Sequence, residues 1–210
     1  MSFIIKHSDN LKTQAAKLLT LASERDILPL SAIREAGVHS IVASRLVREG
    51  RLDRVARGLY RHPDAAIGEY QDLVEVFAKT KKAVVVLLSA LRFHEIGTQQ
   101  PHEVWIQLPA RARIPSIEWP SLRIIRTRID TLFYEGVNKH LIGGIDIPIT
   151  NPARTVADCF KHRNTIGLDI CLEALKELLR RNRNVMDELH YYAKLNRVQR
   201  VMQPYIEATA

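Results

Sequence analysis

The order of the elements predicted in residues 10–62 constrains the fold more than any other feature of this sequence. Apolar residues recur at helical spacing over residues 10–24, which predicts an amphipathic helix. Residues 30–36 predict a short second helix, and residues 39–49 predict a third. Residues 51–61 have the strand character and the central turn of a β-hairpin. A helix, a short helix, a further helix and a hairpin in this order are typical of a winged helix-turn-helix.

Capping and turn residues support these boundaries. Ser31 is the predicted N-cap of the second helix. Gly37 and Gly50 are predicted to end the second and third helices, because glycine readily adopts the left-handed conformation that follows a helix. Residues 56–58, Ala-Arg-Gly, supply the turn of the hairpin. The second and third helices can therefore pack across a glycine-containing turn, and the third helix can present one face to the major groove of DNA.

The third helix divides into an inner and an outer face. Val42 and Leu46 lie one helical turn apart and are predicted to face the core together with Val38. The predicted outer face carries small, hydroxylated and basic residues: Ser40, Ala43, Ser44, Val47 and Arg48. The small residues let the helix backbone approach the groove. Arg48, with Arg45 on the flank, can then reach base edges or phosphates.

The hairpin adds a second basic surface. Between residues 45 and 61, six arginines oppose Glu49 and Asp53, which gives a local net charge of +4. Arg57 at the hairpin tip could enter a minor groove or clamp a phosphate. A basic hairpin alone can be only a solvated face, but arginines on both the third helix and the hairpin favour DNA binding. The candidate DNA-contacting residues are His39, Ser40, Ser44, Arg45, Arg48, Arg54, Arg57 and Arg61; His39 also fits a turn-stabilising or merely exposed role.

The composition fits a globular protein with a polyanionic partner. Of the 210 residues, 46% are hydrophobic and 26% are charged, and the formal net charge is +8. Such a charge favours nucleic acid or an anionic membrane surface as the partner. The longest strongly apolar run, residues 83–88, is far shorter than the roughly 20 residues of a membrane span, and the N-terminus does not resemble a signal peptide. We expect a soluble, cytoplasmic protein without a membrane partner.

The remainder of the chain predicts a larger mixed α/β domain. After a candidate linker, the predicted helices and strands alternate: helix 69–79, strand 83–88, helix 89–96, and strands 103–108 and 122–129. A hairpin follows with Gly143-Gly144 as its turn, and Asn151 and Pro152 begin the first of several final helices. The predicted fold class is α+β. The predicted domains are a winged helix-turn-helix at residues 1–66 and a C-terminal α/β domain at residues 67–210.

No metal, cofactor or catalytic motif stands out in the sequence. Cys159 and Cys171 form neither a C-x-x-C pair nor a Cys/His cluster, so we expect buried thiols rather than zinc ligands. The Glu-x-Lys, phosphate-loop and Gly-x-Gly-x-x-Gly patterns do not occur. The pair His94-Glu95 is a weak acid–base candidate, because adjacent helix residues point in different directions. We therefore expect no cofactor and no enzymatic activity.

Short motifs in both parts resemble one known family. In the N-terminal part they are Gly37-Val38-His39, residues 44–52 (SRLVREGRL) and residues 55–60 (VARGLY). Further along they are residues 88–91 (LSAL) with His94, and residues 150–158 (TNPARTVAD). Over roughly residues 10–180 the chain is similar to the AbiEi family, the antitoxins of type IV toxin–antitoxin, abortive-infection systems.

The resemblance implies a function. Such proteins repress their own operon through the winged helix, which binds inverted repeats beside the promoter, and their C-terminal domain counters a nucleotidyltransferase-like toxin without a stable complex. A double-stranded DNA operator and such a toxin are thus the implied partners, and self-association on DNA is compatible with the repeats.

Arg154 and Asp158, inside the last motif, are spaced to form a structural ion pair across one helical turn.

Two alternatives stay open. The chain could be a stand-alone winged-helix regulator whose C-terminal domain binds a ligand or partner, or an enzyme such as a nuclease with a DNA-targeting head. The late helices also carry five arginines, which fit a solvated face, a further nucleic-acid surface or a contact with a neighbouring protomer: Arg180, Arg181, Arg183, Arg197 and Arg200.

Overall fold

The chain folds into two compact units. The computed structural model describes residues 2–65, 68–80 and 82–209, with side chains from residue 13 onward. The first unit comprises Met1–Lys81 with Leu141–Asp146, and the second comprises Lys82–His140 with Ile147–Ala210. The domain boundary predicted between residues 66 and 67 lies outside the described residues.

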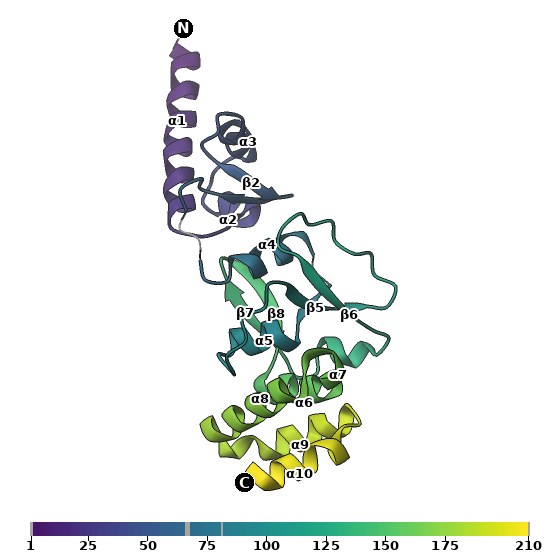
Figure 1. Ribbon diagram of the computed structural model, residues 1–210. Helices are drawn as coiled ribbons and strands as arrows, with labels where there is room; N and C mark the ends of the chain where they lie inside the picture. The colour runs from purple at the N-terminus through teal and green to yellow at the C-terminus, as the bar shows by residue number, and fades with distance from the viewer. Residues whose placement is uncertain (1, 66–67, 81, 210) are drawn as a thin grey trace. The chain divides into compact units, whose positions relative to one another are not determined.

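Three helices and a small sheet form the core of the first unit (Figure 1). Its elements are α1 (Ser2–Ser23), β1 (Leu28–Pro29), α2 (Leu30–Glu35), α3 (Ser40–Arg48), β2 (Asp53–Ala56), β3 (Leu59–Arg61) and α4 (Gln71–Lys79). The sheet has the antiparallel order β1-β3-β2. Apolar residues of α1, α2, α3 and the sheet share one core, as the helical periodicity predicted.

The turn between α2 and α3 is held from α1. The Lys17 ammonium donates to the Ala36 carbonyl at 2.6 Å, and Gln14 accepts from the His39 backbone N–H at 3.1 Å. Gly37 and Gly50 follow the two helices with φ of +73° and +68°, as predicted. These contacts fix the angle at which α3 leaves the turn.

Two details of the first unit differ from the prediction. The N-cap of α2 is Pro29 and not Ser31, and no side chain caps the helix. The Leu30 N–H instead donates at 2.7 Å to the carbonyl of Gly58 in the hairpin turn. The two-residue strand β1 was not predicted, because a strand this short has no periodicity to detect.

The second unit packs helices around a five-stranded mixed sheet. Its first elements are β4 (Val84–Val85), α5 (Leu87–Phe93), β5 (Val104–Pro109), β6 (Leu122–Thr127), a 3-10 turn η1 (Asp130–Phe133), β7 (Val137–Ile142) and β8 (Ile145–Thr150). The sheet order is β6-β5-β4-β8-β7, with β4 antiparallel to β5, β4 parallel to β8, and β5 parallel to β6. Gly143 and Gly144 form the predicted two-residue turn between β7 and β8, at φ of +56° and +82°.

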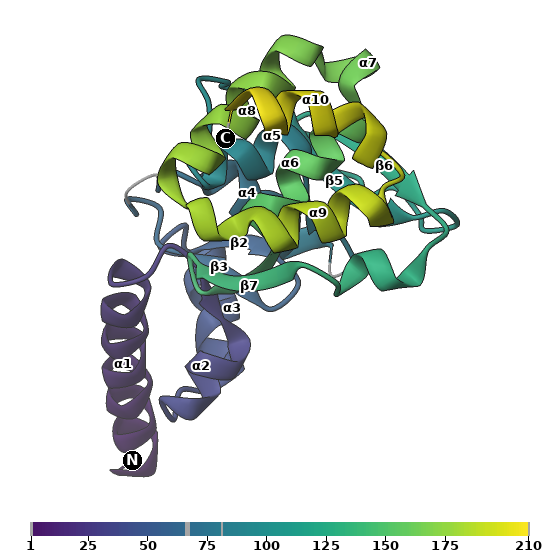
Figure 2. The same ribbon diagram turned by 90° about the horizontal axis from the view of Figure 1, so that it is seen from below.

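Helices complete the second unit. They are α6 (Pro152–Lys161), α7 (Arg163–Ile166), α8 (Leu168–Arg181), η2 (Arg183–Val185), α9 (Met186–Leu195) and α10 (Gln199–Thr209). Helices α8 and α9 pack directly on α6, and α10 packs on α8 and α9 (Figure 2). Asn151 caps α6 as predicted, since its side chain accepts from the Arg154 N–H. The α+β fold class is therefore confirmed.

The apolar run at residues 83–88 is only partly a strand. It forms β4 at Val84–Val85, and α5 begins at Leu87, two residues before the predicted helix start. Residues 83–87 are all buried, so the run carries no periodicity that separates a buried strand from the first turn of a buried helix. Leu87 makes the change of direction at φ +50°.

We expect Gly144→Ala to destabilise the protein by about 2–3 kcal/mol, because the positive φ is strained for alanine and the new methyl has no room. A Cβ at this position would lie 2.6 Å from the Ile27 carbonyl oxygen. Gly37→Ala is the control: its φ is also positive, but nothing lies within 4 Å, so about 1 kcal/mol is expected. Urea unfolding followed by far-UV circular dichroism measures both; equal losses would contradict the steric argument.

Candidate nucleic-acid interface

Helix α3 exposes a continuous polar and basic face. Val42 and Leu46 are buried with Val38, as predicted. Successive residues of an α-helix are rotated by about 100°, so the residues opposite this buried side share one arc. This exposed arc consists of Ser40, Ile41, Ser44 and Arg48, which are exposed, and of Arg45, which is half-buried at its edge.

The two arginines of the exposed arc differ in their partners. Arg45 is half-buried, and its Nε lies 3.5 Å from a carboxylate oxygen of Glu49, which also pairs with Arg51 at 3.8 Å. Arg48 is exposed, and no ion pair of Arg48 is found among the described residues. Arg48 thus has the guanidinium of α3 that is most available to a phosphate or a guanine edge.

The composition of the outer face was partly mispredicted. The prediction that Ala43 faces outward is wrong. Ala43 is fully buried in the core with Ala15, Leu18 and Ala22 of α1, because α1 packs on α3. Val47 is half-buried and packs against the same core. Ile41, which the sequence did not suggest as part of the outer face, is exposed instead. At about 100° per residue, positions 41 and 43 lie symmetrically on either side of the buried line 38, 42 and 46, so the helical period alone does not show which of the two faces outward.

The wing, which is the hairpin of β2 and β3 at Asp53–Arg61, presents two exposed arginines. Arg54 is exposed on β2, and Arg57 is exposed in the turn between β2 and β3. The pairing of β2 and β3 shifts by one residue between Arg54 and Ala56, which marks a β-bulge. Gly58 adopts φ +77° beside Arg57, where a side chain would be strained. The hairpin tip is also held at its back by the hydrogen bond from Leu30.

Arg61 is oriented differently from the other wing arginines. Its Nη1 lies 3.2 Å from Oε1 of Glu75 on α4, and both side chains are largely buried. Gln71 donates to the same oxygen at 3.0 Å. The guanidinium of Arg61 is therefore neutralised at the base of the wing, while Arg54 and Arg57 keep their charge at the surface.

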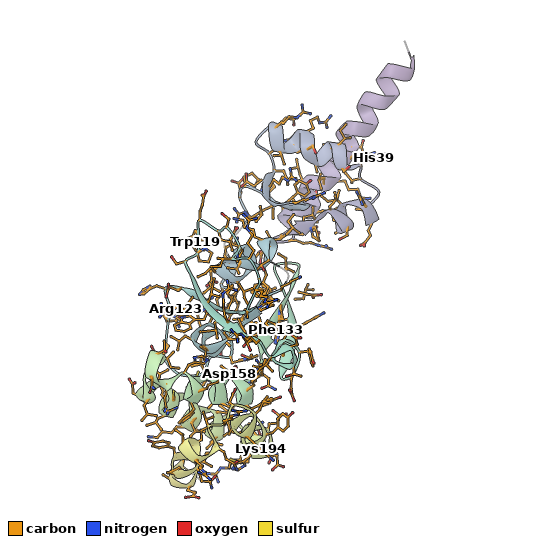
Figure 3. All side chains as sticks on the ribbon, turned by 90° about the vertical axis from the view of Figure 1, so that its right-hand side faces the viewer. His39, Trp119, Arg123, Phe133, Asp158 and Lys194 are labelled. Atoms are coloured by element: carbon orange, nitrogen blue, oxygen red, sulfur yellow. The ribbon has the colours of Figure 1, made fainter. Side chains whose placement is uncertain are left out.

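The remaining candidates lie at the start of α3. His39 is the N-cap residue, and its exposed side chain makes no capping hydrogen bond. Figure 3 labels it at the beginning of α3. Ser40 and Ser44 are exposed, and the Ser44 hydroxyl donates to the Ser40 carbonyl at 3.4 Å, within the helix. The small side chains of Ser40 and Ser44 thus lie on the exposed arc in the N-terminal half of α3.

The Arg154–Asp158 pair is structural, as predicted. Arg154 Nε lies 3.3 Å from Asp158 Oδ2, with side chains 1% and 10% exposed. Arg154 Nη1 donates to the Glu135 carbonyl, and Asn196 Nδ2 donates to Asp158 Oδ1 at 2.6 Å. Figure 3 shows Asp158 among the helices of the second unit. The buried pair therefore ties α6 to α9 and to the segment before β7.

The His94-Glu95 pair also has a structural role. His94 Nε2 hydrogen-bonds the Thr150 carbonyl at 2.7 Å, which joins the end of α5 to β8. Burial lowers the pKa of His94, so the neutral ring, with its Nε2–H as the donor, is favoured. Cys159 and Cys171 are both buried free thiols, as predicted.

No group of three or more His, Cys, Asp or Glu side chains among the described residues could hold a metal ion. None of the helices in the described ranges combines the length and the apolar character needed to cross a membrane.

Known proteins resemble this chain in two respects, the fold and the sequence of the N-terminal part. The structure resembles the crystal structure of the RV2827C protein from Mycobacterium tuberculosis, with a TM-score of 0.52, 16% sequence identity, and coverage of 93% of this chain and 81% of that chain. At this identity the likeness concerns the fold alone. No curated protein matches the chain. Residues 16–63 match the family model AbiEi_4, described as "Transcriptional regulator, AbiEi antitoxin". The resemblance found in the sequence is therefore confirmed for residues 16–63, which include α2, α3 and the wing and match this family model.

Proposed function

We propose that this protein is a DNA-binding transcriptional repressor and antitoxin of a type IV toxin–antitoxin system. It binds operator repeats of its own operon in the cytoplasm and counters a nucleotidyltransferase-like toxin, without catalysis of its own. Residues 1–66 are the DNA-binding domain, and residues 67–210 are the antitoxin domain. One observation carries the proposal: the segment that matches the AbiEi_4 model places an exposed arginine on α3 and two exposed arginines on the wing.

Each candidate residue has a proposed part. Ser40 and Ser44 let α3 approach the major groove, and Arg48 binds a base edge or phosphate there. Arg45 adds charge at the flank, oriented by Glu49. The wing residues Arg54 and Arg57 bind the backbone or the minor groove, and Arg61 holds the base of the wing through Glu75. His39, the exposed N-cap residue of α3, contacts a phosphate.

One experiment separates repression from antitoxin activity. The full-length protein and the double variant Arg48→Ala/Arg57→Ala are expressed in cells with a reporter driven by the protein's own promoter and, separately, with the neighbouring toxin gene. The wild type should repress the reporter and rescue growth. The double variant should lose repression and keep rescue, because both substitutions lie in the DNA-binding domain. A wild type that leaves its own promoter fully active would refute the repressor, and one that fails to rescue would refute the antitoxin.

A cleft in the second unit favours a second candidate function, that of a regulator whose C-terminal domain binds a small anion. The cleft has a volume of about 250 Å³ and is lined by Lys176, Leu179, Arg180, Arg183, Met186 and Thr209. Glu177 pairs with one cation of this rim, Arg180, at 3.6 Å, whereas no ion pair of Lys176 or Arg183 is found among the described residues. The oxygens of that carboxylate already accept from the Gly97 N–H at 2.6 Å and from Arg181, and the Gly97 hydrogen bond in particular lowers its pKa. An apolar floor with a cationic rim suits a small carboxylate that has an apolar body.

Benzoate and the uncharged benzamide test this second function. We expect benzoate to shift the NMR methyl resonance of Met186. The double variant Lys176→Gln/Arg183→Gln should weaken benzoate binding by about tenfold, which is the effect of losing two charge contacts of about 0.7 kcal/mol each. Equal binding of benzoate and benzamide would rule out an anion-selective cleft.

A further inference from the structure

A large apolar side chain lies between the two arginines of the exposed arc of α3. Ile41 is 67% exposed, although the arc otherwise consists of serines and arginines. At about 100° per residue, Ile41 projects between Arg45 and Arg48. It is the second residue of the helix, one turn before Arg45. A branched hydrocarbon therefore lies between the two charges of the arc, in the first turn of the helix.

The position of Ile41 matches the part of a recognition helix that reaches base edges. In helix-turn-helix proteins the N-terminal residues of the second helix of the motif contact the bases. The neighbouring Ser40 and Ser44 are short, so they do not keep the helix away from the groove floor. The 5-methyl group of thymine is the apolar feature of the major groove, and it is recognised by apolar side-chain contact.

We propose that Ile41 is a specificity-determining residue that packs against the 5-methyl group of a thymine in each half-site of the DNA. This inference rests on the proposed DNA-binding function. Arg48 supplies the polar contact beside it, and Ile41 makes the site prefer thymine at one position. Because Ile41 forms no contact with phosphate, it contributes to base preference and not to the salt dependence of binding.

A thymine-to-uracil scan tests the proposal. The full-length protein first selects its preferred duplex from random DNA, and each thymine of that duplex is then replaced singly by deoxyuridine, which removes only the methyl group. At one position per half-site the wild type should lose roughly fourfold in affinity, the value expected for one buried methyl group. The variant Ile41→Ala should bind the thymine and uracil duplexes with equal affinity at that position, with an unchanged salt slope.

A matched control variant replaces an exposed isoleucine that lies outside α3. Ile114 is 53% exposed in the second unit, so Ile114→Ala removes an exposed isoleucine elsewhere and should keep the full sensitivity to uracil. Replacement of an exposed isoleucine by alanine on a helix preserves folding. The uracil scan with the wild-type protein also tests the proposal without any variant. A duplex that is bound tightly but tolerates uracil everywhere would overturn the role of Ile41. Failure to select any duplex would instead overturn the proposed function itself.

Discussion

Arg48→Ala is expected to weaken binding to the protein's own operator by about 1–3 kcal/mol, or roughly 5- to 150-fold. Arg48 is exposed on α3 and has no ion pair among the described residues, so its guanidinium is free to form charge-assisted hydrogen bonds with a guanine or a phosphate. Fluorescence anisotropy with a labelled operator duplex at fixed salt measures the change. If Arg48 binds a base, the loss of affinity should be larger for the operator duplex than for a duplex of unrelated sequence.

Two variants bracket this result. Arg45→Ala should cost less than Arg48→Ala, because the Arg45 guanidinium is already engaged by Glu49. Arg200→Ala removes an exposed arginine of α10 and should leave operator affinity within twofold, although it changes the net charge equally. If Arg48→Ala and Arg200→Ala had the same small effect, α3 would not be the recognition helix.

Arg154→Ala should destabilise the second unit by about 3–5 kcal/mol, the largest effect on stability that we expect from a single substitution. The variant leaves the buried carboxylate of Asp158 without its cation and removes the hydrogen bond to the Glu135 carbonyl. Among the described residues, the Asp158 carboxylate would then keep the hydrogen bond from Asn196 alone. Trp105 and Trp119, the chain's two tryptophans, both lie in the second unit, so urea unfolding followed by tryptophan fluorescence reports on it directly.

Removing both charges of the buried pair should rescue part of the lost stability. In Arg154→Met/Asp158→Leu both charges are replaced by apolar side chains of similar volume, and the double variant should be more stable than Arg154→Ala. Arg180→Ala is the surface control: its guanidinium lies 3.6 Å from Glu177 and is mostly exposed, so less than 1 kcal/mol is expected. A loss below 1 kcal/mol for Arg154→Ala would show that the buried pair does not hold α6 in place.

The elements with strong local signals were predictable from the sequence. Asn151 with Pro152 started α6, Gly143-Gly144 turned the β7–β8 hairpin, and the periodicity of Val38, Val42 and Leu46 defined the inner face of α3. In each case short-range backbone preference or helical period determines the structure by itself.

The parts that failed depend on tertiary contacts. Ala43 is buried only because α1 packs on α3, and the start of α2 is fixed by the carbonyl of Gly58, which is far away in sequence. The pairing of Arg61 with Glu75 likewise needs α4 beside the wing. Within the candidate interface, sequence reasoning therefore named most of the polar residues. It could not tell which arginines are neutralised, and it overlooked Ile41.

The central claim is that arginines on α3 and the wing contact the grooves and phosphates of duplex DNA. Its most direct test is the affinity of the full-length protein for its own promoter duplex at several salt concentrations, for the wild type and for Arg45→Ala/Arg48→Ala/Arg57→Ala. Each phosphate contact contributes about 0.9 to the slope of log K against log salt. We predict that the triple variant loses most of its affinity and has a shallower salt slope. An affinity and a slope equal to those of the wild type would contradict the account.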